Sequence, residues 1–370
     1  MTLGVLVRRL NQLRHVEGAV REAHVRGHRV EIFLDSRGPQ TGPKGDEFPR
    51  RGLVPSRFDA WATFLRWPSL VPKVDALLVP APLGIGINVE TPPEPPLPPA
   101  RAYCALQTAW SDLMYLRPDE AERWDAVYTW SARWADWWQE AHGCPPSNFV
   151  PVGLPVAEHL RWIDPAEVRT AFGIAPGPVV LYLPFPFGAH EQDWRLRYLY
   201  RLSPWGDRAT VRAVRTYCDR QGAQFVVKSR AKTPVPAYLA DAADVVVDRD
   251  EPGEPTLLRL LTTATLMVHH TSSAVAEAAA AGVRALSIVP PHWTAYEGRG
   301  PDFDPDGTLS FYGWTGLSVT WPAAWARRRR LENAGTGISG MARDAYVERF
   351  LGGEPFNAGK LIIDDLEKRL

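Results

Sequence analysis

A run of hydroxyl side chains follows two histidines and opens an Ala-rich stretch, Leu-Met-Val-His-His-Thr-Ser-Ser-Ala-Val-Ala-Glu, at residues 266–277. Ser and Thr favour helix N-caps, and alanine favours the helix that would follow. The free backbone N–H groups at such a helix start, together with the helix dipole, attract phosphate. Glu277 lies one helical turn beyond Ser273, within reach of hydroxyl groups on the same ligand. An ordinary capped turn with a solvated Glu277 is the alternative. The predicted phosphate-binding residues are Thr271, Ser272, Ser273 and Glu277.

A second cationic segment, Lys-Ser-Arg-Ala-Lys at residues 228–232, follows an apolar stretch that predicts a strand at 224–228. Lys228 and Arg230 would then lie just past the end of a strand near the one at 266–268. Cations that converge with helix N–H groups indicate a diphosphate site. Three solvated surface cations are the alternative.

Polar side chains also follow two strands expected in the first half of the chain. Ligands of open parallel sheets bind at the carboxyl ends of the strands. Asp112 and His15 are candidate general bases, although an Asp after a Ser also fits a helix cap. The substrate-binding candidates are Arg8, Arg9, Arg14 and Gln107, with a solvated loop as the alternative for the cations.

The elements that would position these residues alternate between strand and helix. The first helix is expected after His15 and ends near Gly27. Ser131 is expected to cap a Trp-rich helix whose indoles we interpret as packing residues, with ligand stacking as the alternative. This alternation predicts an α/β fold with two βα series and no internal sequence repeat. Strands are expected at 3–7, 30–34, 75–79, 101–107, 125–130, 148–152, 178–183, 224–228, 245–247, 266–268 and 284–289.

Composition limits the classes of function. The 370 residues carry 42 Lys+Arg and 42 Asp+Glu, so no global basic field for nucleic acid exists and anion binding must be local. Three widely spaced cysteines indicate neither disulfides nor zinc. No apolar run is long enough to span a membrane, and we expect a cytoplasmic protein. Walker A and GxGxxG motifs are absent, which disfavours P-loop kinases and dinucleotide dehydrogenases.

Two segments outside the strands carry further expectations. The Pro-rich core at 91–99 predicts a stiff polyproline II surface segment, with a recognition ligand as the alternative. The stretch 321–330 combines two Trp with four consecutive Arg. It could contact the anionic inner surface of a membrane peripherally, or form a solvated helix end.

Several motifs together resemble GT-B fold glycosyltransferases. The most similar branch includes the CDP-glycerol polyol phosphotransferases and the UDP-N-acetylglucosamine 2-epimerase-like enzymes. The resemblance covers nearly the whole chain. It rests on Arg-Gly-His-Arg-Val at 26–30, Gly-Leu-Pro at 153–155, Val-Val-Lys-Ser-Arg at 226–230, His-Thr-Ser-Ser-Ala-Val-Ala-Glu at 270–277, and Ala-Gly-Lys-Leu-Ile-Ile-Asp-Asp-Leu at 358–366.

The resemblance implies two Rossmann-like domains facing across a cleft. An acceptor domain would span 1–153 and a nucleotide-donor domain 154–340, with C-terminal helices at 341–370 packing back on the first. Ser272 and Ser273 would bind the donor phosphates and Glu277 the ribose hydroxyls, with Lys228 and Arg230 as counter-charges. The family's Lys-Pro-His-Pro motif is here Lys-Ser-Arg-Ala, at 228–231. Arg230 could replace the missing charge, and His269 or His270 the missing hydrogen bond, which makes His270 a further catalytic candidate.

The function expected from these features is transfer of a sugar or polyol-phosphate group from a UDP- or CDP-type donor to a hydroxyl acceptor, in synthesis of a surface or cell-envelope glycan. The acceptor would be a glycan or a lipid-linked molecule. No metal and no further cofactor is expected. A nucleotide-sugar 2-epimerase or hydrolase, and a non-catalytic nucleotide-sugar-binding protein, are the alternatives.

Overall fold

The computed structural model divides into two compact units. Unit 1 comprises Met1–Glu158, Glu251–Pro255 and Glu348–Leu370, and unit 2 comprises His159–Asp250 and Thr256–Val347. The expected assignment of acceptor and donor to separate domains stays a prediction, because a division into units says nothing about ligands. The structure describes residues 1–35, 51–68, 71–80, 97–109, 112–113, 116–143, 148–184, 203–229, 235–248, 250–251, 253–270, 272–289, 319–320 and 340–370.

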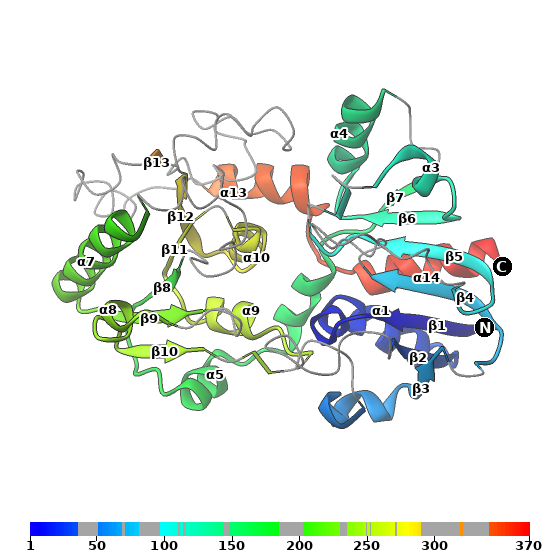
Figure 1. Ribbon diagram of the computed structural model, residues 1–370, viewed down its shortest axis with the longest axis horizontal. Coiled ribbons are helices and arrows are strands. Elements are labelled where there is room, and N and C mark those ends of the chain that lie inside the picture. The colour runs from blue at the N-terminus through cyan, green and yellow to red at the C-terminus, as the bar shows by residue number, and fades with distance from the viewer. Residues whose placement is uncertain are drawn as a thin grey trace. The chain divides into compact units, whose positions relative to one another are not determined.

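Unit 1 is built on a seven-stranded parallel sheet with the order β3-β2-β1-β4-β5-β6-β7 (Figure 1). Its strands are β1 (Thr2–Val7), β2 (Arg29–Asp35), β3 (Thr63–Trp67), β4 (Val74–Pro80), β5 (Ala100–Leu106), β6 (Ala126–Thr129) and β7 (Phe149–Pro151). Its α-helices are α1 (Leu13–Val25), α3 (Pro118–Ala121), α4 (Ala132–His142) and α14 (Ala358–Arg369). Shorter 3₁₀ helices span Leu10–Gln12, Arg51–Leu53 and Ser56–Ala60, and a π-helix spans Val347–Leu351.

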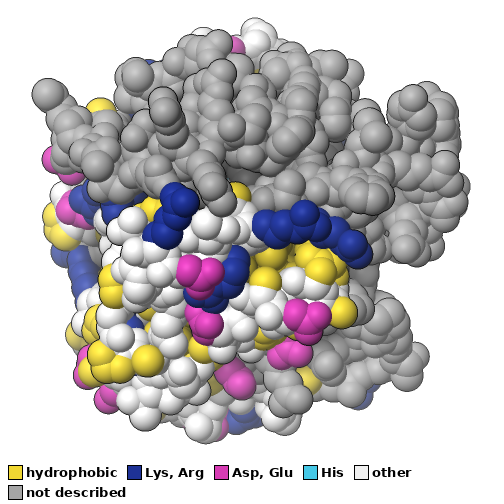
Figure 2. Space-filling model, turned by 90° about the vertical axis from the view of Figure 1, so that its left-hand side faces the viewer, with side chains coloured by type: hydrophobic (Ala, Val, Ile, Leu, Met, Phe, Trp, Pro, Cys, Tyr) yellow, Lys and Arg dark blue, Asp and Glu magenta, His cyan; other side chains and the backbone are white. Residues whose placement is uncertain are grey.

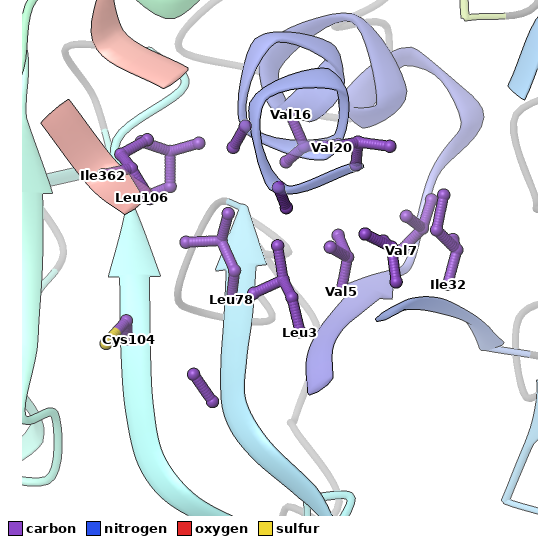
Figure 3. Close-up of a cluster of buried hydrophobic side chains, with 14 of the residues drawn as sticks. Leu3, Val5, Val7, Val16, Val20, Ile32, Leu78, Cys104, Leu106 and Ile362 are labelled. Carbon is purple, nitrogen blue, oxygen red and sulfur yellow. The ribbon is translucent and has the colours of Figure 1, made fainter. Parts of the chain in front are cut away.

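The core of unit 1 lies between one face of this sheet and helices α1 and α14. Val16 and Val20 of α1 point toward the strand residues Leu3 and Leu78 (Figure 3). Ile362 of α14 belongs to the same buried cluster. Apolar side chains from the end of the chain thus complete a core begun by its first strand, as the hydrophobic effect requires of an α/β layer.

The packing of α14 on α1 depends on a glycine, Gly359, that lies against the backbone of Gly18. A Cβ atom on Gly359 would lie 2.3 Å from the backbone carbon of Gly18, and one on Gly18 would lie 1.7 Å from Oε2 of Glu158. Gly359 N–H donates to Glu158 Oε1 at 2.7 Å. At Gly359 the two helices therefore approach so closely that only hydrogen fits, whereas a Cβ on Gly18 would meet the end of the Glu158 side chain.

Unit 2 is built on a six-stranded parallel sheet with the order β10-β9-β8-β11-β12-β13. Its strands are β8 (Val179–Leu183), β9 (Gln224–Lys228), β10 (Val245–Val247), β11 (Leu266–His270), β12 (Arg284–Val289) and β13 (Val319–Thr320). Its α-helices are α5 (Pro165–Phe172), α7 (Ser203–Gln221), α8 (Ala237–Ala240), α9 (Thr256–Leu261), α10 (Ala274–Ala280) and α13 (Gly340–Tyr346). The 3₁₀ helix Pro155–Trp162 leads from unit 1 into unit 2.

The expected α/β fold with two Rossmann-like domains is confirmed, as is the return of the C-terminal helix to the first of them. All eleven expected strands exist, but β3 and β13 were not predicted. One local expectation was wrong, because helix α1 begins at Leu13, before His15. Ser131 occupies the N-cap position of α4 as expected, but its hydroxyl donates to the Arg349 carbonyl at 2.6 Å and makes no cap hydrogen bond. The expected packing role of the Trp-rich helix is confirmed, since its three indoles are buried: Trp134, Trp137 and Trp138.

An ion network joins the C-terminal end of α1 to α14 and predicts an acid-sensitive contact. Arg26 pairs with Asp364 at 2.7 Å and with Glu367 at 2.8 Å, and His28 Nε2 lies 2.7 Å from Glu367. Hydrogen bonds lower the pKa of Asp364, the larger effect coming from Lys360 and the smaller from Arg26. Hydrogen bonds from His28 and, to a smaller extent, Arg26 lower the pKa of Glu367. Carboxylates with lowered folded-state pKa values stabilise the fold above their unfolded pKa, roughly 4, and lose that contribution as pH falls through the folded value.

We therefore expect Arg26→Ala to lower the melting temperature at pH 7, and the difference from wild type to shrink as the pH falls below about 4. Thermal unfolding across this range measures it. Arg123→Ala is the control, because Arg123 is exposed and forms no ion pair with a described residue. A difference that persists unchanged at pH 3 would contradict the electrostatic account.

The surface of the described residues mixes charges of both signs. On the face shown in Figure 2, Lys and Arg side chains lie beside Asp and Glu side chains. This agrees with the balanced composition. No helix among the described residues is both long and apolar enough to cross a membrane.

Candidate functional site

Both sheets have a topological switch point at which their strand order reverses. In unit 1 the reversal lies between β1 and β4, and in unit 2 between β8 and β11. In doubly wound folds the connections leave such a strand pair in opposite directions, and ligands bind in the crevice between them. The candidate residues of each unit can therefore be located relative to its switch point.

In unit 2, His269 lies directly at the switch point. It pairs in register with Leu183, the last residue of β8, and its side chain is fully buried. The backbone N–H of Ser272 donates to His269 Nδ1 at 3.1 Å. Strand β11 continues through both histidines, two residues further than expected, so His269 fixes the turn that leads into α10.

The predicted hydroxyl and carboxylate groups follow in this turn. The Ser272 hydroxyl accepts a hydrogen bond from the Ala274 N–H at 3.3 Å, while Ser273 occupies the N-cap position without a side-chain cap. Glu277 lies in the first turn of α10 and is 8% exposed. Gly282 follows the helix with a φ of 71°, as expected for a C′ glycine. The seven residues of α10 make a short helix, so its dipole contributes less than the sequence suggested.

Lys228 lies at the same level of the sheet as His269. Val227 pairs with Tyr182, which places Lys228 beside Leu183 on β8, with His269 on the other side. Strand β8 thus separates the two, and two strand spacings amount to roughly 10 Å. Laterally paired residues point to the same face of a sheet, so the cation and the imidazole share one face.

Three predicted site positions cannot be placed. Arg230 and Thr271 lie outside the described residues, as does the side chain of His270, and their roles stay predictions. The basic stretch at 321–330 also lies outside them, as does most of the Pro-rich segment, 91–96.

In unit 1 the switch point is bridged by Gln12. Its Oε1 accepts hydrogen bonds from the backbone N–H groups of Arg8 and Arg9 at 2.8 and 2.9 Å, and its Nε2 donates to the Pro80 carbonyl at 2.9 Å. The backbone donors after β1 are therefore used within the protein. The Arg9 side chain is exposed, which leaves it accessible to an anionic ligand.

Arg14 and His15 belong to the first turn of α1 and not to a polar loop. His15 is 7% exposed, and Arg14 Nε donates to His15 Nε2 at 3.2 Å. That nitrogen of His15 acts as an acceptor in this arrangement. Its predicted role as a general base is not tested by this geometry.

Asp112 and Gln107 lie after β5. Asp112 Oδ2 accepts hydrogen bonds from the Thr108 N–H at 2.6 Å, the Thr108 hydroxyl at 2.9 Å and the Ala109 N–H at 2.9 Å. Burial raises the pKa of Asp112, while these hydrogen bonds act in the opposite direction. Asp112 thus closes a turn through N–H groups that precede it, and not as the N-cap of a following helix, and its role as a base stays a prediction. Gln107 is fully buried and accepts from the Trp130 N–H at 2.9 Å through Oε1.

Two surface cavities formed by described residues lie elsewhere. Neither is lined by a predicted site residue, and no group of three or more potential metal ligands occurs among the described residues. The first, about 650 Å³, belongs to unit 1 and is lined in part by Arg133, Asp136, Glu348 and Gly352. The second, about 370 Å³, belongs to unit 2 and is lined in part by Arg208, Arg212 and Tyr238.

The local sequence does not indicate the positioning role of Gln12 or the partner of Lys228. Lys228 Nζ lies 2.9 Å from Asp250 Oδ1. Nothing in the local sequence distinguishes Asp250 from the neighbouring acid Asp248. The pairing of β9 with β10, in which Lys228 lies opposite Val247, brings Asp250 close.

Comparison with solved structures shows the fold of the whole chain. A structure of the wall teichoic acid polymerase TagF is similar with a TM-score of 0.57 and 13% identity, over 100% of this chain and 88% of that one. The UDP-GlcNAc 2-epimerase from Methanocaldococcus jannaschii gives a TM-score of 0.52 and 10% identity, over 100% of both chains. S. aureus MnaA, in its UDP co-structure, gives 0.52 and 8% identity, over 100% of this chain and 96% of that one.

These likenesses and the two Rossmann-like units show that the chain has the GT-B fold, which confirms the resemblance at the level of fold. No family model matches the sequence. No curated protein matches it either.

Proposed function

We propose that this protein transfers a sugar or polyol-phosphate group from a nucleotide-activated donor to a hydroxyl acceptor. The observation that carries the proposal is the placement of Lys228, His269, Ser272 and Glu277 around the unit-2 switch point. A cation, hydroxyl groups and a carboxylate at that edge fit a ligand that carries both phosphates and ribose hydroxyls. Similar folds include a TagF variant soaked with CDPG and MnaA with UDP, which supports this choice of ligand class.

In the proposed reaction an acceptor oxygen forms the new bond while the donor loses its nucleotide. With a nucleotide sugar, the oxygen attacks the anomeric carbon, the bond to the diphosphate breaks, and a nucleoside diphosphate leaves with the electron pair. With CDP-glycerol, the oxygen attacks the β-phosphorus and CMP leaves. In either case the acceptor proton passes to a base, for which Asp112, His15 and His270 are the proposed candidates.

The leaving phosphate develops negative charge, and stabilising that charge supplies most of the catalysis in this proposal. Lys228 and Arg230 would provide the counter-charge without a metal, and Ser272 and Ser273 would donate hydrogen bonds. Arg8, Arg9, Arg14 and Gln107 would bind the acceptor, a glycan or lipid-linked molecule of the cell envelope. Contact with the inner membrane surface is part of the same proposal.

The proposal is tested by incubating the protein with UDP-sugars or CDP-glycerol, with and without a mixture of glycan acceptors, and measuring released UDP or CMP by chromatography. We expect nucleotide release from one donor class that depends on acceptor. Donor consumption without acceptor would favour the epimerase or hydrolase. Binding with no turnover would favour a non-catalytic role.

A further inference from the structure

We propose that Asp250 is an internal counter-ion of Lys228, which a ligand phosphate must displace, and that it thereby sets the affinity of the unit-2 site for phosphate. This inference rests on the proposed function. It adds Asp250, which lowers the affinity for phosphate, to the residues that bind the ligand.

Lys228 is held in a place where it needs an anionic partner. Its side chain is only 6% exposed, and Nζ lies 2.9 Å from Asp250 Oδ1 and donates to the Ser229 carbonyl. A buried ammonium without a paired charge is costly, because it loses its hydration without compensation. Some anion must therefore remain beside Lys228 whether or not a ligand is bound.

Asp250 is the partner that can leave. Its side chain is 49% exposed, and it forms no other ion pair or hydrogen bond with a described residue. Displaced from Lys228, its carboxylate returns to water at little cost, since exposed ion pairs contribute little. The backbone nearby is fixed without it, because Ser229 N–H donates to the Val247 carbonyl at 3.1 Å.

The exchange imposes a requirement on the ligand. A phosphate oxygen can replace the carboxylate because it restores the negative charge beside Lys228. A nucleoside without phosphate cannot, since it would leave the buried ammonium unpaired. Every phosphate ligand must also overcome the attraction between Lys228 and Asp250. Its measured affinity is therefore weaker than the affinity of the same site without Asp250.

The test is calorimetric titration of UDP, CDP and inorganic diphosphate into the wild type and four variants. The first two are Asp250→Asn and its control Asp248→Asn, which removes an exposed acid with no ion pair to a described residue. The others are Lys228→Met and the double variant Lys228→Met/Asp250→Asn. We expect Asp250→Asn to bind the ligand about fivefold more tightly, Asp248→Asn to match wild type, and the double variant to bind as weakly as Lys228→Met.

A purely structural ion pair makes the opposite prediction, in which Asp250→Asn lowers both the melting temperature and the affinity. That result, or an unchanged affinity, overturns the inference while binding by wild type preserves the proposed function. If Asp250→Asn binds a ligand and the wild type does not bind detectably, the inference is supported. If neither the wild type nor any variant binds any of the three ligands, both the proposed site and the proposed role of Asp250 are refuted.

Discussion

Replacing Gly359 with alanine should destabilise the protein by about 3 kcal/mol. The new methyl group would lie 2.3 Å from the backbone carbon and 2.5 Å from the carbonyl oxygen of Gly18. Neither atom is the end of a flexible side chain, so helix α14 must move away from α1. That movement would also lengthen the 2.7 Å hydrogen bond from Gly359 N–H to Glu158. Urea unfolding followed by circular dichroism measures the change.

Gly52→Ala is the matched control for this substitution. Gly52 is a described glycine whose added Cβ would meet no atom within 4 Å and whose φ is not in the left-handed region. We expect its unfolding free energy to change by less than about 0.5 kcal/mol. Equal effects of the two substitutions would show that the close approach of α1 and α14 does not exist in solution.

Replacing Lys228 with methionine should weaken nucleoside diphosphate binding roughly 30-fold, which corresponds to about 2 kcal/mol. The buried ammonium makes a charge-assisted contact with phosphate that an apolar side chain of similar length cannot make. The fold should persist, because methionine fills the space of the lysine stem and leaves the half-exposed Asp250 to water. Titration with the nucleotide that the wild type binds measures the loss.

Lys73→Met serves as the control for charge alone, since Lys73 is an exposed lysine of unit 1. Its removal should leave the dissociation constant unchanged. Unchanged affinity in Lys228→Met would exclude Lys228 from the phosphate site and would remove the main support for placing a donor there.

The parts of the fold that the sequence predicts are those with a strong local signal. Strands β1, β4 and β9 are short apolar runs bounded by polar residues, which predict buried strands. Strand β3 lacks this signal, because it lies at the sheet edge and only Trp67 among its five residues is buried. The start of α1 was misplaced since it follows a 3₁₀ turn and has Gln12, without a side-chain cap, at its N-cap.

The site is harder to predict because its contacts join distant residues. Gln12 is a positioning residue only because Pro80, 68 positions later, accepts from its amide. The Ser131 hydroxyl has a cap's sequence context but donates to Arg349, 218 positions away. Local patterns therefore placed His269, Ser272 and Glu277 at the correct strand end, while the hydrogen bonds that orient such residues required the tertiary structure.

The proposed function requires that the carboxyl edge of the unit-2 sheet binds a nucleotide. A thermal-shift panel of UDP, CDP, GDP, UDP-sugars and CDP-glycerol tests it most directly, with the wild type, Ser272→Ala, Glu277→Gln and the control Ser56→Ala. A ligand at 100 times its dissociation constant stabilises a folded protein by roughly 2.7 kcal/mol. The account predicts that one nucleotide family raises the melting temperature of wild type and Ser56→Ala but much less that of the two site variants. If no nucleotide shifts the wild type, or all four chains shift equally, the turn after β11 is only a capped helix start and the claim is wrong.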